Sequence, residues 1–237
     1  QHLLINEPKG RLFEEMLKIL LSGNALNVVR ELAELNLPRR VFPLFDGLFF
    51  HKSHDAFAYK VLGKTDLRIA SGEDVSLVFI LAGLIWSAIY QSWQQELKQG
   101  VHAKQALMDA IARNKTVIFN SGVTRNLYTA MRDMWMLQVE FDAPSVAKLD
   151  HLLNHNRFRQ AWHLFTMRND FLQVDPQIFA WWDNFMASTD TDKTDLMIEL
   201  VDLAPAEPKK KSKRRKSKRK RNVKKMPQVG ENLEFDF

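Results

Sequence analysis

The run PKKKSKRRKSKRKRNVKK, residues 208–225, is the most distinctive chemistry in the sequence. It holds 13 lysines and arginines and no acid. The whole chain has 34 basic and 28 acidic residues. Outside the run 21 basic residues remain, so the rest of the chain carries a net charge of −7. A dense like-charge run stays solvated and binds polyanions, although a nuclear-localisation signal is a rival interpretation. The cations of this basic run are Lys209, Lys210, Lys211, Lys213, Arg214, Arg215, Lys216, Lys218, Arg219, Lys220, Arg221, Lys224 and Lys225.

A second mixture of cations and rings lies in HNRFRQAW, residues 155–162. Single-stranded RNA is bound by such mixtures, because cations pair with phosphates and rings stack on bases. Helical spacing instead predicts that Phe158 and Trp162 face the core. It leaves open whether Arg157 and Arg159 contact RNA or only face solvent. We take as candidate RNA contacts the arginines expected on the flanks or outer faces of helices: Arg125, Arg132, Arg157, Arg159 and Arg168.

Catalytic and metal-binding patterns are weak by comparison. The sequence before the basic run has no Gly-rich phosphate loop. Asp190, Asp192 and Asp195 lie in STDTDKTD, where we expect a solvated connector or a helix cap rather than the rigid carboxylates that metal-assisted nucleotidyl transfer needs. His151 and His155 have the i,i+4 spacing of shared metal ligands, but no third ligand is near them in sequence. We therefore predict no catalytic residue and no metal site in this chain.

The elements that position these side chains are expected to be helices, because helical periodicity runs through almost the whole sequence before the basic run. RLFEEMLKILLSGN and ALNVVRELAELNLP predict an antiparallel hairpin that turns at Gly23, with Glu14 paired to Lys18. A helix is expected over about residues 55–63, and a long one over 75–90 that continues into QSWQQELKQG. No strand pattern is found. We predict an all-α fold: a multi-helix body of about ten helices with a disordered basic C-terminal tail.

Later helices carry the candidate arginines. VTRNLYTAMRDMWMLQVEF is expected to turn Met131, Met134 and Trp135 inward, which leaves its arginines on the other face. Asp175 followed by Pro176 is typical of a helix start. The helix that follows contains WW, and we do not expect two adjacent tryptophans both to face fully inward.

Composition limits the class of protein. Hydrophobic residues make up 46% of the chain and aromatic residues 11%, enough for a buried core. The absence of cysteine excludes disulfides and fits a reducing compartment, so we expect a cytoplasmic location. The apolar segment Val75–Tyr90 is shorter than the ~18–20 residues of a membrane span, which favours a core helix. No leader pattern opens the chain, and the lack of Met at Gln1 suggests a piece of a longer protein.

Several segments together carry a family resemblance. VLGKTDLRIASGEDVSLVFILAGLIW, residues 61–86, resembles the C-terminal part of bacterial poly(A) polymerases, which are related to the class II CCA-adding tRNA nucleotidyltransferases. The resemblance continues in RLFEEMLKILLSG, TAMRDMWMLQ, LLNHNRFRQAWHLFTMRND and WWDNF, and it covers roughly residues 3–187. A Lys/Arg-rich extension follows, which marks the polymerase branch of that superfamily rather than the CCA-adding branch.

The resemblance implies a division of the chain into three parts. Residues 1–38 would end the neck as a helical hairpin, 39–202 would form a helical RNA-binding body, and 203–237 would form a disordered RNA-binding tail. The first helix of the hairpin would pack on the neck and support its nucleotide pocket through Arg11, Glu14 and Glu15.

The resemblance also implies an activity for the parent protein: addition of AMP from ATP to RNA 3′ ends, with Mg²⁺. The family's Gly-Gly loop, DxD and Glu-Asp-x-x-Arg motifs are not found in this sequence, so catalysis is expected in residues not supplied and the chain alone is expected to be inactive. No cofactor is expected in this chain. The implied partners are single-stranded RNA 3′ ends, the protein's own catalytic head and RNA-decay proteins, and not a membrane.

Two other functions fit the same residues. A helical interaction module could use the basic run as a nucleic-acid anchor or a localisation signal. The body of a CCA-adding enzyme would prefer tRNA over unstructured RNA, and the basic extension argues against it.

Overall fold

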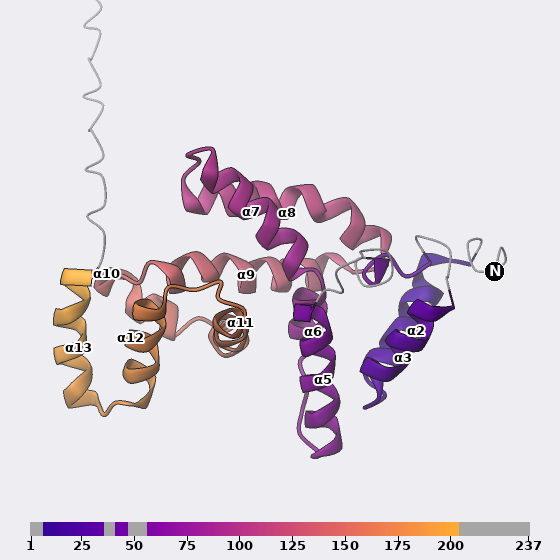
Figure 1. Ribbon diagram of the computed structural model, residues 1–237, viewed down its shortest axis with the longest axis horizontal. Coiled ribbons are helices and arrows are strands. Elements are labelled where there is room, and N and C mark those ends of the chain that lie inside the picture. Colours follow the sequence, from indigo (N-terminus) through magenta and orange to yellow (C-terminus); the bar gives the residue numbers. More distant parts are fainter. Residues whose placement is uncertain (1–6, 36–40, 47–55, 204–237) are drawn as a thin grey trace, which may run out of the picture. The chain divides into compact units, whose positions relative to one another are not determined.

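The computed structural model describes residues 7–35, 41–46 and 56–203. In these ranges the chain forms helices and no strand, so the predicted all-α class is confirmed. The basic run lies outside the described residues. The helices, shown in Figure 1, are α2 (Lys9–Leu20), α3 (Ala25–Glu34), α5 (Ala56–Ala70), α6 (Leu77–Leu84), α7 (Trp86–Lys98), α8 (Ala103–Asn120), α9 (Arg125–Asp142), α10 (Val146–Leu153), α11 (Phe158–Asp170), α12 (Pro176–Ala187) and α13 (Asp190–Leu203).

The contacts of the chain define a first unit, residues 1–204. Every described residue belongs to the first unit. The boundaries expected after residues 38 and 202 stay predictions.

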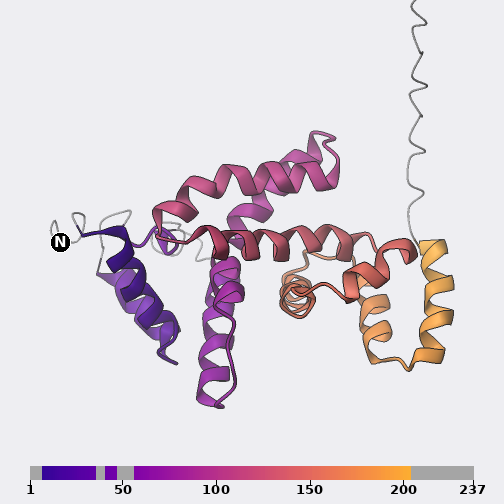
Figure 2. The same cartoon turned by 180° about the vertical axis from the view of Figure 1, so that it is seen from behind.

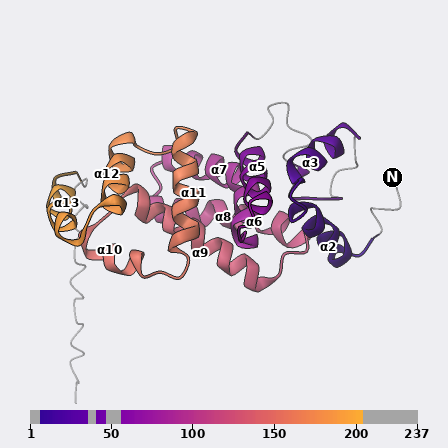
Figure 3. The same ribbon diagram turned by 90° about the horizontal axis from the view of Figure 1, so that it is seen from below.

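Helix α9 is the element on which many of the others pack. It contacts α6, α8 and α11, and it also contacts α10. Figures 1 and 2 show α7 and α8 on one side of α9, with α5, α6 and α11 on the other. Figure 3 shows α11 standing between α12 and the α5–α6 pair. This arrangement brings the start of α6 to α11, so that Ser76 and Gln160 touch across 84 positions of sequence.

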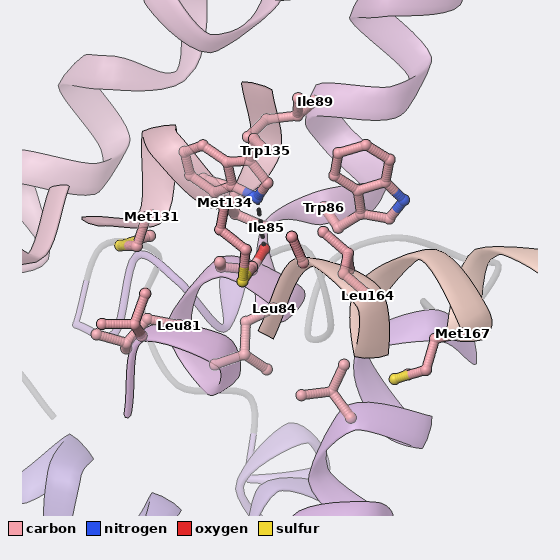
Figure 4. Packing of buried hydrophobic residues seen from close by; sticks show 14 of the residues in the cluster. Leu81, Leu84, Ile85, Trp86, Ile89, Met131, Met134, Trp135, Leu164 and Met167 are labelled. Atoms are coloured by element: carbon pink, nitrogen blue, oxygen red, sulfur yellow. Dashed lines mark hydrogen bonds between the residues drawn. The ribbon is translucent and has the colours of Figure 1, made fainter. Parts of the chain in front are cut away.

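The core at the centre of the first unit is built from tryptophan, methionine and leucine side chains of α6, α7, α9 and α11 (Figure 4). Met131, Met134 and Trp135 are fully buried, as the periodicity of α9 predicts. The indole Nε1 of Trp135 donates to the carbonyl of Ala82, 3.3 Å away, which satisfies the polar atom that burial of the ring would otherwise leave without a partner.

The expected long helix over residues 75–90 is broken in two. α6 ends and α7 begins at Ile85, with an angle of 54° between them, so the prediction of one continuous helix is wrong. Tertiary packing explains the break: both sides are buried, and the Nε1 of Trp86 donates to Gln173 at 2.8 Å. In the described residues no single helix is long and apolar enough to cross a membrane, and α6 and α7 meet that test only as a bent pair.

The predicted hairpin is formed by α2 and α3. Gly23 lies in the turn with φ +75°, a left-handed conformation that favours glycine. Asp66 of α5 caps the N-terminus of α3, since its carboxylate accepts hydrogen bonds from the backbone N–H groups of Ala25 and Leu26 at 2.8 and 2.9 Å. The predicted pair of Glu14 with Lys18 is not seen.

Lys18 instead bonds the carboxylate three residues before it, that of Glu15, at 2.7 Å. Arg11 pairs with Glu7 at 3.4 Å, and Glu14 is exposed. The three residues expected to support a neck pocket therefore lie on the exposed face of α2, and their role stays a prediction.

Two further expectations are corrected by tertiary packing. α5 runs to Ala70 instead of ending near Gly63. Thr65, just after that glycine, is buried, and its hydroxyl donates to the carbonyl of Val61 at 2.8 Å. Trp181 and Trp182 are both buried, since they face different neighbours. The Nε1 of Trp181 donates to Leu196 of α13 and that of Trp182 to Phe141 of α9, each at 2.9 Å.

Candidate nucleic-acid interface

A groove of about 870 Å³ lies between the second half of α5, the segment that leads into α6, and α11. Three cations line it: Lys64 and Arg68 from α5, and Arg159 from the first turn of α11. Lys64 and Arg68 stand four residues apart and so share one face of α5. The groove therefore combines one arginine that the sequence analysis selected with two cations that it missed.

The cations differ in how they are held. The guanidinium of Arg68 pairs with Glu73 at 3.0 Å and donates to the carbonyl of Asp74 at 3.1 and 3.3 Å. The amine of Lys64 lies 3.8 Å from Asp170. Arg159 is exposed and, among the described residues, has no hydrogen bond or ion pair. Its guanidinium is therefore open to an incoming anion.

Two rings stand in the same groove. Phe79 of α6 and His163 of α11 make an edge-to-face contact with 6.4 Å between ring centroids. Burial lowers the pKa of His163 from its ordinary 6.5, and the charges of Arg68, Arg159 and Lys64 lower it further. A cation cluster that keeps an imidazole neutral favours the binding of an anion.

An uncharged polar contact joins α11 to the start of α6. Ser76 caps α6 by accepting from the backbone N–H of Phe79 at 3.3 Å, and its Oγ also lies 3.4 Å from the Nε2 of Gln160. The Oε1 of Gln160 is buried and has no hydrogen-bond partner. Cations, rings and a free amide acceptor are the groups that hold phosphates and unstacked bases of single-stranded RNA.

Arg125 and Arg132 lie on the exposed face of α9, as predicted, but they do not line the groove. Burial raises the pKa of Tyr128, beside them in the same helix, and the charge of Arg132 opposes that shift. Across from it on α8, the amine of Lys115 stands 6.0 Å from the centre of the Tyr128 ring. These side chains form a separate basic surface.

The prediction that Arg168 lies on an exposed flank is wrong. Arg168 is fully buried and pairs with Asp142 at 2.8 Å, while it donates to Gln138 and to the carbonyl of Gln173, both at 3.1 Å. Its guanidinium carbon also lies 5.3 Å from the centre of the Trp86 ring. The Arg168 side chain links α11 to α9, and because it is buried it is not accessible to RNA.

Arg157 lies at the start of α11, where its backbone has a structural role. It is the N-cap of α11, and its backbone N–H donates to the Nδ1 of His155 at 3.1 Å. Its side chain is half-buried and does not line the groove, whereas Arg159 does. Of the five arginines selected from the sequence, the structure brings only Arg159 together with other cations of this groove.

The acids and histidines considered for a metal do not gather. No group of three His, Asp or Glu side chains in the described ranges could hold a metal ion. The rings of His151 and His155 are 6.2 Å apart. Asp192 accepts a hydrogen bond from Thr189 at 2.7 Å and lies in the first turn of α13, so of the two expected alternatives, connector or helix cap, the structure shows the helix start.

Family comparisons agree with the helical segments and the basic run. A family described as "Polymerase A arginine-rich C-terminus" matches residues 99–221, about half of the chain. The chain belongs to this family of poly(A) polymerase C-terminal regions. A second family, "Probable RNA and SrmB- binding site of polymerase A", matches residues 1–48.

Individual relatives carry the same name. Poly(A) polymerase I of Salmonella typhi is 28% identical over 84% of this chain and 44% of its own length. Those of Escherichia coli O157:H7 and Haemophilus influenzae are 28% and 27% identical over 89% and 88% of this chain. The chain spans about half the length of these relatives, and the predicted resemblance to a poly(A) polymerase C-terminal portion is confirmed.

Proposed function

We propose that this chain is the RNA-binding C-terminal part of a poly(A) polymerase, and that single-stranded RNA lies in the groove between α5, α6 and α11. The observation that carries the proposal is the meeting of Lys64, Arg68 and Arg159 beside Phe79 and His163 in a chain of this family. Cations on a strand's phosphates and rings beside its bases are what single-strand recognition requires.

The parent protein would add AMP from ATP to RNA 3′ ends. ATP and Mg²⁺ would bind a catalytic head outside this sequence, and this chain alone would be inactive. A helical body contributes by holding the strand, since fixing the 3′ end beside the reacting nucleotide lowers the entropic part of the barrier. The basic run would add binding without base selection, because lysine and arginine pair with phosphates of any sequence.

Further partners and the location are part of the same proposal. The family that matches residues 1–48 is described by RNA and SrmB binding, which supports the α2–α3 hairpin as a docking surface for RNA and a protein. The catalytic head and RNA-decay proteins would be partners in the cytoplasm. A CCA-adding role is disfavoured, because the match to the arginine-rich family includes most of the basic run, through residue 221.

The test is the affinity of the chain for unstructured RNA after removal of groove cations. Arg159→Ala is expected to weaken binding roughly tenfold and to reduce the slope of log affinity against log salt by about 0.7. Lys98→Ala is the matched control, because it removes one exposed charge from α7, which does not line the groove. Equal affinities for the wild type and both variants would contradict the proposal.

A further inference from the structure

Gln160 is a lining residue whose amide oxygen is buried without a hydrogen-bond partner. Its Nε2 reaches Ser76 at 3.4 Å, the outer limit of a hydrogen bond. A buried acceptor without a partner costs about 1–3 kcal/mol in mutational data. Because the one contact of this amide is long, the amide can turn into the groove at little cost and bond a ligand there.

The surroundings of Gln160 match the parts of a nucleotide. Arg159, one residue before it, is unpaired among the described residues and suits a phosphate, and Arg68 stands across the groove. Phe79 and the neutral His163 offer ring surfaces for a base. The volume of about 870 Å³ is ample for one nucleotide. The two rings lie edge to face, so a base stacks on one of them, and purines stack more strongly than pyrimidines.

The amide decides between the purines. A glutamine amide accepts from one atom and donates from another, which complements N6 and N7 of adenine, whereas the same edge of guanine offers two acceptors and is paired by arginine or lysine. We propose that the groove holds one adenine nucleotide, with its phosphate at Arg68 and Arg159 and its base hydrogen-bonded by Gln160. This inference rests on the proposed RNA-binding function and names the base that the groove selects.

The experiment measures base selectivity with the full chain. Three short RNAs of equal length are compared: all uridine, uridine with one central adenosine, and uridine with one central guanosine. The basic run binds the three alike, because phosphate contacts carry no sequence information. The wild type is expected to bind the adenosine RNA roughly tenfold more tightly than the other two.

Substitutions of Gln160 test the preference for adenine separately from RNA binding itself. Gln160→Met keeps the volume of the side chain and is expected to bind all three RNAs alike, with the affinity of the wild type for the uridine RNA. Gln95→Ala, on the exposed surface of α7, should keep the preference. A preference that persists in Gln160→Met and in Gln160→Ala overturns the inference, as do equal affinities of the wild type for the three RNAs. Failure of the wild type to bind any of them would instead overturn the proposed function.

Free nucleotide and an RNA residue share the chemistry that this site would recognise. Adding AMP distinguishes them. Displacement of the adenosine RNA from the wild type, reduced in Gln160→Met, would assign the groove to a free adenine nucleotide. Retention of the RNA at the same AMP concentration would assign it to an adenosine within the strand.

Discussion

At the scale of single residues, Arg168 and Arg159 differ in environment although both are arginines of α11. Arg168 is enclosed by Asp142, Gln138 and Trp86, whereas Arg159 is exposed in the groove. Burial raises the pKa of Asp142, and the Arg168 guanidinium opposes that shift. Arg168 is fully buried, whereas Asp142 keeps 31% of its side-chain surface exposed, so the guanidinium is the charge that would be most costly without its partner.

Loss of the buried guanidinium should destabilise the fold strongly. Arg168→Met is expected to lower the free energy of unfolding by about 3 kcal/mol, because it leaves the Asp142 carboxylate without its cation. Chemical denaturation followed by circular dichroism measures the change. Arg159→Ala is the control and should change stability by less than about 0.5 kcal/mol. Equal stability of Arg168→Met and the wild type would show that the buried pair contributes nothing.

His163 gives the groove a pH dependence whose sign can be worked out. Its pKa in the folded chain lies below 6.5, so the unfolded chain binds more protons and stability falls as the pH drops through about 6.5. The negative charge of a bound RNA phosphate would offset the positive charges of Lys64, Arg68 and Arg159 around the ring. Glu73, which also lines the groove, already pairs with Arg68. RNA bound there would therefore raise the pKa of His163, and binding would take up a proton.

RNA affinity should accordingly rise as the pH is lowered below about 6.5. Fluorescence anisotropy with labelled RNA across this range measures the change, and His163→Gln should flatten it. A wild-type affinity that falls with pH, or a rise that His163→Gln leaves intact, would contradict this role for the imidazole.

At the scale of elements, the close approach of α5 and α6 fixes one wall of the groove. Gly83 permits it, because a Cβ at that position would stand 2.7 Å from a methyl group of Val61. Gly83→Ala is expected to cost about 1–3 kcal/mol of unfolding free energy by overpacking. Gly10→Ala is the matched control, because nothing lies within 4 Å of its Cβ and the change should be neutral or slightly stabilising. Thermal unfolding of both variants tests the difference, and similar melting temperatures would refute it.

Most of these elements could be predicted from the sequence, because helical periodicity is a local property. The inward face of α9 and the start of α12 at Asp175 follow from spacing and capping alone. The break at Ile85 could not be predicted, since it depends on where α6 and α7 find partners. Nor could the burial of Arg168, because its partners come from other parts of the chain.

The groove shows the same limit of prediction. Lys64 and Arg68 have a helical spacing that marks a shared face, which was the available signal. Nothing in that spacing shows that Arg159 and His163 lie opposite them. The RNA-binding hypothesis came from the cations and rings of the sequence and from the family resemblance, and the packing of α11 beside α6 brings the groove residues together.

At the scale of the whole molecule, the proposal combines two kinds of RNA binding in one chain. Outside the basic run the chain carries a net negative charge, and three of its cations line the groove, whereas the basic run is uniformly positive. The run should raise the encounter rate and the salt dependence, and the groove should position the strand. If about six of its cations contact a single strand, the run alone contributes a slope of log affinity against log salt of roughly −4.

The most direct test of this account is the RNA affinity of a chain that ends at Ala204, measured against salt, with and without Arg159→Ala. The shortened chain should keep its helix content and its melting temperature, bind RNA more weakly with a shallower salt slope, and lose roughly a further tenfold with Arg159→Ala. A shortened chain that is folded but binds no RNA, or one that binds equally well without Arg159, would contradict the claim that the helices hold the strand.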